Sequence, residues 1–202
     1  MDKFINSCIK NSRLLSIILL LTAGVIAFIL DVKGYPDYFF PAMGHTFLIL
    51  IDVGILISGP ILLLCGKERA GKILVSIFVI TRVYIEVQRG LSGSYALING
   101  VGGLTIFYDL SLFIMGLLMI SAVAFHIVFR VNGKNDFLKV SNCLAIITVC
   151  AYIVVFVARI IINIQYKAEF QTWVDNLNLY IIVPLALLFS YLFLTNRTDV
   201  IE

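Results

Sequence analysis

The chain has few charged residues: Asp, Glu, Lys and Arg make up 13% of its 202 residues, whereas 61% are hydrophobic. Soluble domains carry about 25% charged residues. The mean hydropathy of +1.04 points the same way, and no stretch is left over for a separate soluble domain. The net charge of +3 is small and its basic residues are spread over several connections, so we expect no nucleic-acid partner.

Cysteine and histidine are also scarce, with four and two residues. The cysteines form no Cys-x-x-Cys pair. Cys143 and Cys150 would lie roughly 10 Å apart along a helix, which exceeds disulfide reach, so we expect reduced thiols. His45 and His126 are expected at opposite membrane faces, which excludes joint haem ligation or a zinc triad. We therefore expect no metal and no cofactor.

Long apolar runs set the fold class. A hydrocarbon core of about 30 Å is crossed by a helix of roughly 20 apolar residues. The sequence predicts an all-α fold, a polytopic bundle of six transmembrane helices in a single integral membrane domain over residues 1–202. The spans are expected at about 14–31, 46–65, 71–89, 105–130, 139–165 and 177–196.

The charges of the connections predict the topology. With six spans, ten basic residues fall on the side of the N-terminus, and only Lys33, Arg89 and Lys167 fall on the other. Because cytoplasmic loops carry the excess of Lys and Arg, we expect both termini in the cytoplasm and the protein in the cell membrane. The inner turns, 66–71 and 131–136, are short, so their flanking helices are expected to form antiparallel hairpins.

Several segments outside the spans also have a predicted structure. Residues 4–10 are amphipathic and favour a short interfacial helix before the first span. The apolar spacing within residues 170–177 predicts a short helix lying on the outer surface. The glycines of segment 90–103 predict a flexible loop or re-entrant stretch. Pro60 and Pro184 are expected to kink or loosen their helices.

Three ionisable residues lie inside predicted spans. A rise of about 1.5 Å per residue places Arg82 roughly 15 Å, and Asp52 roughly 20 Å, from the cytoplasmic edge. In an antiparallel hairpin these depths match, so we predict an Asp52–Arg82 pair with Glu86 one turn further out. One carboxylate would remain uncompensated and available for a proton, a cation or a basic group, because ionised groups at bilayer depth are costly and generally have a task.

Three further polar residues, Asp109, Arg159 and His45, are expected near the outer edge. With the intramembrane trio they define a polar region in the outer half of the bundle, a candidate binding or proton-coupling pocket open to the outside. The alternative is that the trio only locks two helices together and that the outer three are ordinary interfacial residues. The segment Arg82–Gln88 (RVYIEVQ) also echoes Arg159–Gln165 (RIIINIQ), a faint sign of internal repetition.

One catalytic motif needs comment. Gly90-Leu91-Ser92-Gly93 resembles the GxSG nucleophile segment of rhomboid intramembrane proteases, which implies a serine that works with a histidine on a later helix. The chain has no histidine after His126, so Ser92 lacks a base to activate it. We expect no catalytic residue and no enzyme activity.

The favoured hypothesis is a small solute transporter, or the substrate-binding membrane subunit of one. The size, topology and outward polar region are similar to those of substrate-capture subunits of energy-coupling-factor transporters. Since 202 residues are few for an alternating-access carrier, we expect a homo-oligomer or a partner membrane subunit. A non-catalytic accessory, assembly or immunity protein is the alternative, and a rhomboid-like protease is the third possibility.

Overall fold

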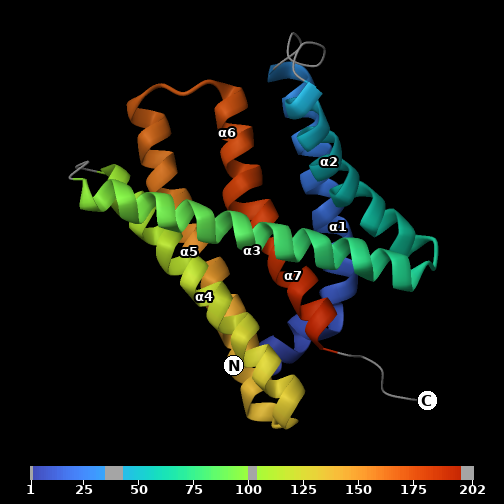
Figure 1. The fold of residues 1–202 in the computed structure, drawn as a ribbon. Helices are drawn as coiled ribbons and strands as arrows, with labels where there is room; N and C mark the ends of the chain where they lie inside the picture. Colours follow the sequence, from blue (N-terminus) through green and yellow to red (C-terminus); the bar gives the residue numbers. More distant parts are fainter. Residues whose placement is uncertain (1, 35–42, 100–103, 197–202) are drawn as a thin grey trace. The chain divides into compact units, whose positions relative to one another are not determined.

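The computed structural model describes residues 2–34, 43–99 and 104–196, and the elements there are helices without any strand (Figure 1). The predicted all-α class is therefore confirmed. In chain order the elements are α1 (Asp2–Gly34), α2 (Met43–Leu64), α3 (Glu68–Ile98), α4 (Leu104–Asn132), α5 (Asn135–Gln165), α6 (Phe170–Leu177), the π-helix η1 (Asn178–Ile182) and α7 (Val183–Thr195).

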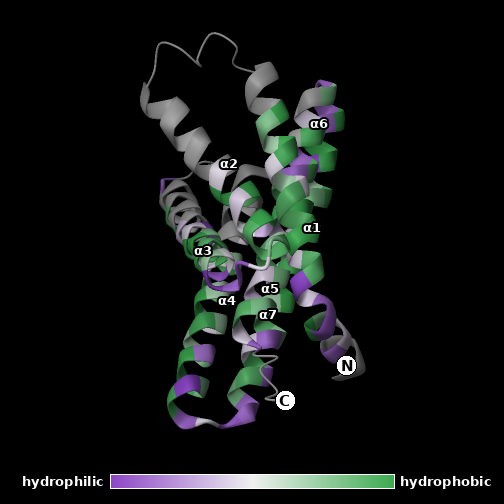
Figure 2. Ribbon diagram, turned by 90° about the vertical axis from the view of Figure 1, so that its right-hand side faces the viewer, coloured by the Kyte–Doolittle hydropathy of each residue, from purple (hydrophilic) through white to green (hydrophobic). Residues whose placement is uncertain are grey.

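Four stretches of the described residues are long and apolar enough to cross a membrane: Asn6–Ile29, Phe113–Asn132, Asn135–Gln165 and Thr172–Thr195. A shorter apolar segment, Gly54–Leu64, lies in α2. Figure 2 shows hydrophobic residues along the helices and hydrophilic residues gathered at the turn between α4 and α5. Helices of this length and composition indicate a membrane protein.

Two short predicted elements are absent because longer helices include them. α1 begins at Asp2 and continues through the first apolar run, so the amphipathic N-terminal residues are not a separate interfacial helix. α3 continues nine residues past Arg89 to Ile98, so residues 90–98 are helical and not the expected loop. The glycines there cost helix stability, about 1 kcal/mol each relative to alanine, but good helix formers lie between them.

The predicted helix at residues 170–177 is confirmed as α6, but it is not a separate element. Its backbone stays helical at Leu177 (φ −61°, ψ −45°) and at Val183 (φ −64°, ψ −43°), so α6, η1 and α7 form one continuous helical segment. α6 and η1 both pack against α1. α6 thus begins a longer helical segment beside α1, and its position on the outer membrane surface stays a prediction.

The chain divides into two compact units, which are described separately: Met1–Val79 with Ile161–Glu202, and Ile80–Ile160. In the first unit, α1 packs against α2, α6, η1 and α7. Small residues allow close contact there: a Cβ added at Gly24 would lie 2.8 Å from Cγ1 of Ile57. Ser16 and Ser190 are fully buried, and their hydroxyl oxygens are 2.8 Å apart. This hydrogen bond joins α1 to α7.

We expect the Ser16–Ser190 bond to contribute about 0.6 kcal/mol, the average for side-chain hydrogen bonds between membrane helices. A double-mutant cycle of Ser16→Ala and Ser190→Ala, followed by thermal unfolding in detergent, measures this coupling. Ser121→Ala is the control, because the Ser121 hydroxyl donates to Leu117 of its own helix. Strictly additive single losses would contradict a bond between α1 and α7.

The turn between α2 and α3 is as short as predicted. Gly66 has φ +73°, and the backbone N–H groups of Lys67 and Gly66 donate to the carbonyls of Leu62 (2.8 Å) and Leu63 (3.3 Å). This pair of bonds is the Schellman motif, which requires a left-handed residue and so favours glycine. The corresponding glycine of the α4–α5 turn is Gly133, with φ +68°.

α2 and α3 approach each other beside this turn. A Cβ at Gly59 would lie 3.3 Å from Cβ of Leu74, so α2 and α3 touch close to the turn. The short turn is therefore confirmed, and the antiparallel course of the two helices beyond it stays a prediction.

Candidate functional site

The six predicted site residues all lie on helices: His45 and Asp52 on α2, Arg82 and Glu86 on α3, Asp109 on α4, and Arg159 on α5. The described side chains among them are those of the two arginines. The side chains of His45, Asp52, Glu86 and Asp109 lie outside the described part of the structure.

The division into units separates the predicted residues into two groups. Arg82, Glu86, Asp109 and Arg159 belong to the unit Ile80–Ile160. His45 and Asp52 belong to the other unit. The predicted Asp52–Arg82 pair, which assumed an antiparallel hairpin, stays a prediction. Of the predicted site residues, the unit Ile80–Ile160 therefore holds two arginines and two carboxylic acids, which lie on three helices.

Arg82 and Arg159 are both half-buried. The Nε and Nη2 atoms of Arg82 and the Nε atom of Arg159 are shielded from solvent. A guanidinium group carries five N–H donors in a fixed plane and cannot accept a hydrogen bond. Burying its nitrogen atoms restricts the acceptors it can meet to groups inside the protein or to a bound molecule. Among the six candidate residues, these are the two whose side chains the structure describes.

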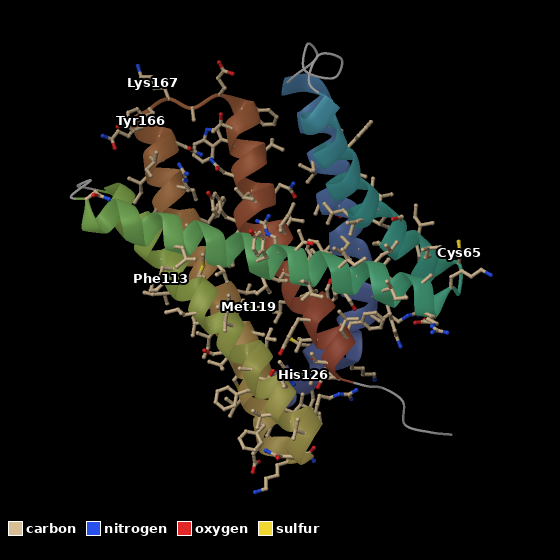
Figure 3. All side chains as sticks on the ribbon, viewed as in Figure 1. Cys65, Phe113, Met119, His126, Tyr166 and Lys167 are labelled. Atoms are coloured by element: carbon tan, nitrogen blue, oxygen red, sulfur yellow. The ribbon has the colours of Figure 1, made fainter. Side chains whose placement is uncertain are left out.

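The opposite end of the same unit is closed by apolar packing. Met115, Met119 and Ala122 recur along one buried face of α4, and His126 continues this face (Figure 3). The Ser141 hydroxyl of α5 donates to the Ala122 carbonyl at 2.8 Å.

Aromatic rings continue this packing toward the α4–α5 turn. The ring centroids of Phe125 and Phe137 are 6.2 Å apart and stacked. The His126 ring lies 6.0 Å from the Phe129 ring, tilted by 47°. The imidazole is therefore part of the packing between α4 and α5.

A cluster of buried asparagines in the first unit was missed by the sequence argument. Asn176 Nδ2 donates to Asn163 Oδ1 at 3.2 Å, which ties α6 to the end of α5. Asn178 Nδ2 donates to the Ala23 carbonyl of α1 at 3.4 Å. All three asparagines are at least nine-tenths buried. Within the described residues, Asn163 Nδ2 and Asn178 Oδ1 have no hydrogen-bond partner. In the sequence, the sign of their burial is that they lie in or beside apolar segments, but uncharged asparagines are less conspicuous there than charged residues.

The π-helix beside these asparagines follows from Pro184. Proline has no N–H and its ring clashes with the carbonyl four residues earlier, here that of Tyr180. The helical turn before Pro184 therefore includes one extra residue, and the Val183 N–H donates to the Asn178 carbonyl, five residues earlier. The predicted loosening of the helix at Pro184 is confirmed. Such π-segments are frequent at functional sites.

No group of three or more His, Cys, Asp and Glu residues able to hold a metal occurs among the described residues. Comparisons with protein-family models, with curated proteins and with solved structures found no match.

Proposed function

We propose that the chain is a multi-pass protein of the cell membrane with six spans and both termini in the cytoplasm. Four membrane-length apolar helices support the proposal, and α2 and α3 supply the remaining two spans. The two glycine turns, at Gly66 and Gly133, carry the exposed basic residues Lys67 and Lys134. Basic turns of this kind favour the cytoplasmic side.

The protein's function is the handling of a small solute, either as a transporter or as the substrate-binding membrane subunit of one. The observation that carries this is the burial of guanidinium nitrogens of Arg82 and Arg159 in one unit. Ionisable groups inside membrane helices are costly and generally serve a pathway or binding site. Because arginine only donates hydrogen bonds, the solute carries an acceptor-rich or anionic group. Glu86 and Asp109 are the proton-coupling candidates of the same unit.

We expect Arg82→Gln and Arg159→Gln each to weaken solute binding by about tenfold, or about 1.4 kcal/mol. The value is close to that of a hydrogen bond to a charged group. A thermal-shift screen of the purified protein against small metabolites finds the solute, and titration then gives Kd for each variant. Arg130→Gln is the matched control, because Arg130 is exposed at the end of α4, and it should bind like the wild type.

Arg82→Lys keeps the charge but loses the planar fork, so it tests the site even if Arg82→Gln is unstable. Wild-type affinity in both Arg82→Lys and Arg159→Gln would contradict the proposal. So would a screen in which no compound raises the melting temperature of the wild type.

A second candidate is a non-catalytic accessory, assembly or immunity protein. The hydrogen bonds Ser16–Ser190 and Asn163–Asn176 favour it, since they show buried polar groups that join helices. In that case the arginine substitutions lower stability, and no small metabolite raises the melting temperature of the wild type. The protease possibility is not proposed, because the chain has no histidine after His126; unchanged activity in Ser92→Ala would exclude it.

In the proposed membrane, the protein acts with a partner subunit or as a homo-oligomer. Carriers that alternate access usually do so through two half-bundles that move against each other, and a second copy or a partner subunit supplies the second half-bundle. Cross-linking in membranes, followed by mass measurement, tests it. A strictly monomeric and fully active protein would contradict it.

A further inference from the structure

The turn between α2 and α3 carries three exposed basic residues, Lys67, Arg69 and Lys72, which we call the turn patch. The one acidic residue among them, Glu68, is held in a salt bridge by Arg13 of α1. Because Arg13 neutralises the charge of Glu68, Glu68 does not neutralise any of the three positive charges of the turn patch. The turn patch is a concentrated positive surface at one end of the first unit.

Exposed apolar side chains lie directly beside the turn patch. Leu64 is 62% exposed, Ile73 is 54% exposed and Ile61 is 45% exposed. They flank the turn on both helices, and Leu64 ends the apolar segment Gly54–Leu64. On the proposed six-span topology, these exposed aliphatic side chains at the end of an apolar segment face acyl chains, which places the turn patch where the hydrocarbon ends and the lipid phosphates begin.

Lys72 also has a fixed position at this boundary. Its Nζ atom lies 5.6 Å from the centroid of the Phe193 ring of α7. A cation over an aromatic face is held there by about 0.5–1 kcal/mol at an exposed site. The ammonium group therefore stays near the end of α7 and keeps its outer side available to an anion.

We propose that the turn patch binds the headgroup of an anionic phospholipid whose acyl chains cover Leu64 and Ile73. A phospholipid satisfies both chemistries at once: its phosphate and negative headgroup complement Lys67, Arg69 and Lys72, and its tails cover the neighbouring apolar side chains. An acidic soluble protein complements the charges alone. Each basic residue near an anionic membrane surface contributes an attraction of about 1 kcal/mol, so three are enough to select one class of lipid.

The test uses the full-length protein in nanodiscs made from equal parts of phosphatidylglycerol and phosphatidylcholine. After gentle extraction, native mass spectrometry counts the two lipids that stay bound. The variant is Lys67→Gln/Arg69→Gln/Lys72→Gln. The control, Arg130→Gln/Lys134→Gln/Lys139→Gln, removes the same charge at the α4–α5 turn. We expect the phosphatidylglycerol preference to fall about tenfold in the variant and to remain in the control.

Two outcomes overturn the proposal: an equal loss in the variant and the control, which indicates a general effect of net charge, and an unchanged preference in the variant. If the variant does not fold, the wild type alone decides. Its phosphatidylglycerol preference should weaken as salt rises, since exposed charges are screened, and a salt-independent preference overturns the proposal. Displacement of the lipid by inorganic phosphate also overturns it, because the tails would then contribute nothing.

Discussion

Gly71→Val is expected to lower the free energy of unfolding by about 3 kcal/mol, the upper end of the usual cost of overpacking. A Cβ at Gly71 would lie 2.6 Å from both Cγ and Cδ2 of Leu63 and 3.1 Å from the Leu63 backbone nitrogen. Contacts this short are not tolerated, so Leu63 has to move before any side chain larger than hydrogen fits. Valine adds two methyl groups beyond Cβ and makes the conflict worse.

Leu63 is poorly able to move. Its side chain is 1% exposed, so rotation would push it into filled space. Its carbonyl accepts hydrogen bonds from Arg13 Nη2 at 3.2 Å and from the Gly66 N–H at 3.3 Å. A displaced Leu63 would disturb the link to α1 and the Schellman turn together. The cost therefore extends beyond one steric contact.

Thermal unfolding of the purified protein in detergent measures the effect, and Gly54→Ala is the matched control. A Cβ at Gly54 meets nothing within 4 Å, so this substitution gains helix propensity, about 0.5–1 kcal/mol, without a clash. We expect the melting temperature to fall by several degrees for Gly71→Val and to stay level or rise for Gly54→Ala. Equal melting temperatures would show that α2 and α3 do not approach closely at Gly71.

The sequence was sufficient for features that depend on local chemistry. Apolar runs predict helices because no other backbone arrangement in this composition satisfies its own polar groups within a bilayer. Gly66 and Gly133 predict the two short turns because a left-handed residue is needed where a helix ends so abruptly. Pro184 predicts the loosened helix for an equally local reason, a missing N–H.

Features that depend on neighbouring elements could not be read from the sequence. The amphipathic spacing at residues 170–177 predicts a helix, but its continuation into η1 and α7 beside α1 depends on the neighbouring elements. The course of α3 is similar: a short turn makes two helices adjacent at their ends, but the sequence does not say how far they run along each other. The antiparallel hairpin therefore stays a prediction.

The candidate site shows the same limit. Charged residues inside apolar runs are conspicuous, so the sequence alone makes Arg82 and Arg159 candidates. Asparagine is common in loops and carries no charge, so the sequence does not indicate that Asn163, Asn176 and Asn178 are buried. Their importance comes from burial and from the partners that the fold supplies, neither of which follows from spacing alone.

The Asn163–Asn176 pair gives the second large effect, and the two single substitutions should be unequal. In Asn176→Leu, the buried carboxamide of Asn163 loses the donor to its Oδ1, and within the described residues its Nδ2 already has no partner. A buried polar group left unpaired costs about 1–3 kcal/mol, so we expect a loss of about 2 kcal/mol. Asn163→Leu removes the unpaired donor along with the acceptor, so its loss should be smaller.

The double variant Asn163→Leu/Asn176→Leu should recover most of this stability, because replacing both partners by apolar groups of similar size leaves no buried polar atom behind. Thermal unfolding of the wild type, both single variants and the double variant measures the cycle. Two equal single losses that simply add would contradict a direct bond between α5 and α6. Solute binding assayed on the same four proteins then separates two roles for the pair. A double variant that is stable and binds solute uses these asparagines only to join helices, whereas a stable double variant that no longer binds places the amides in the solute's path.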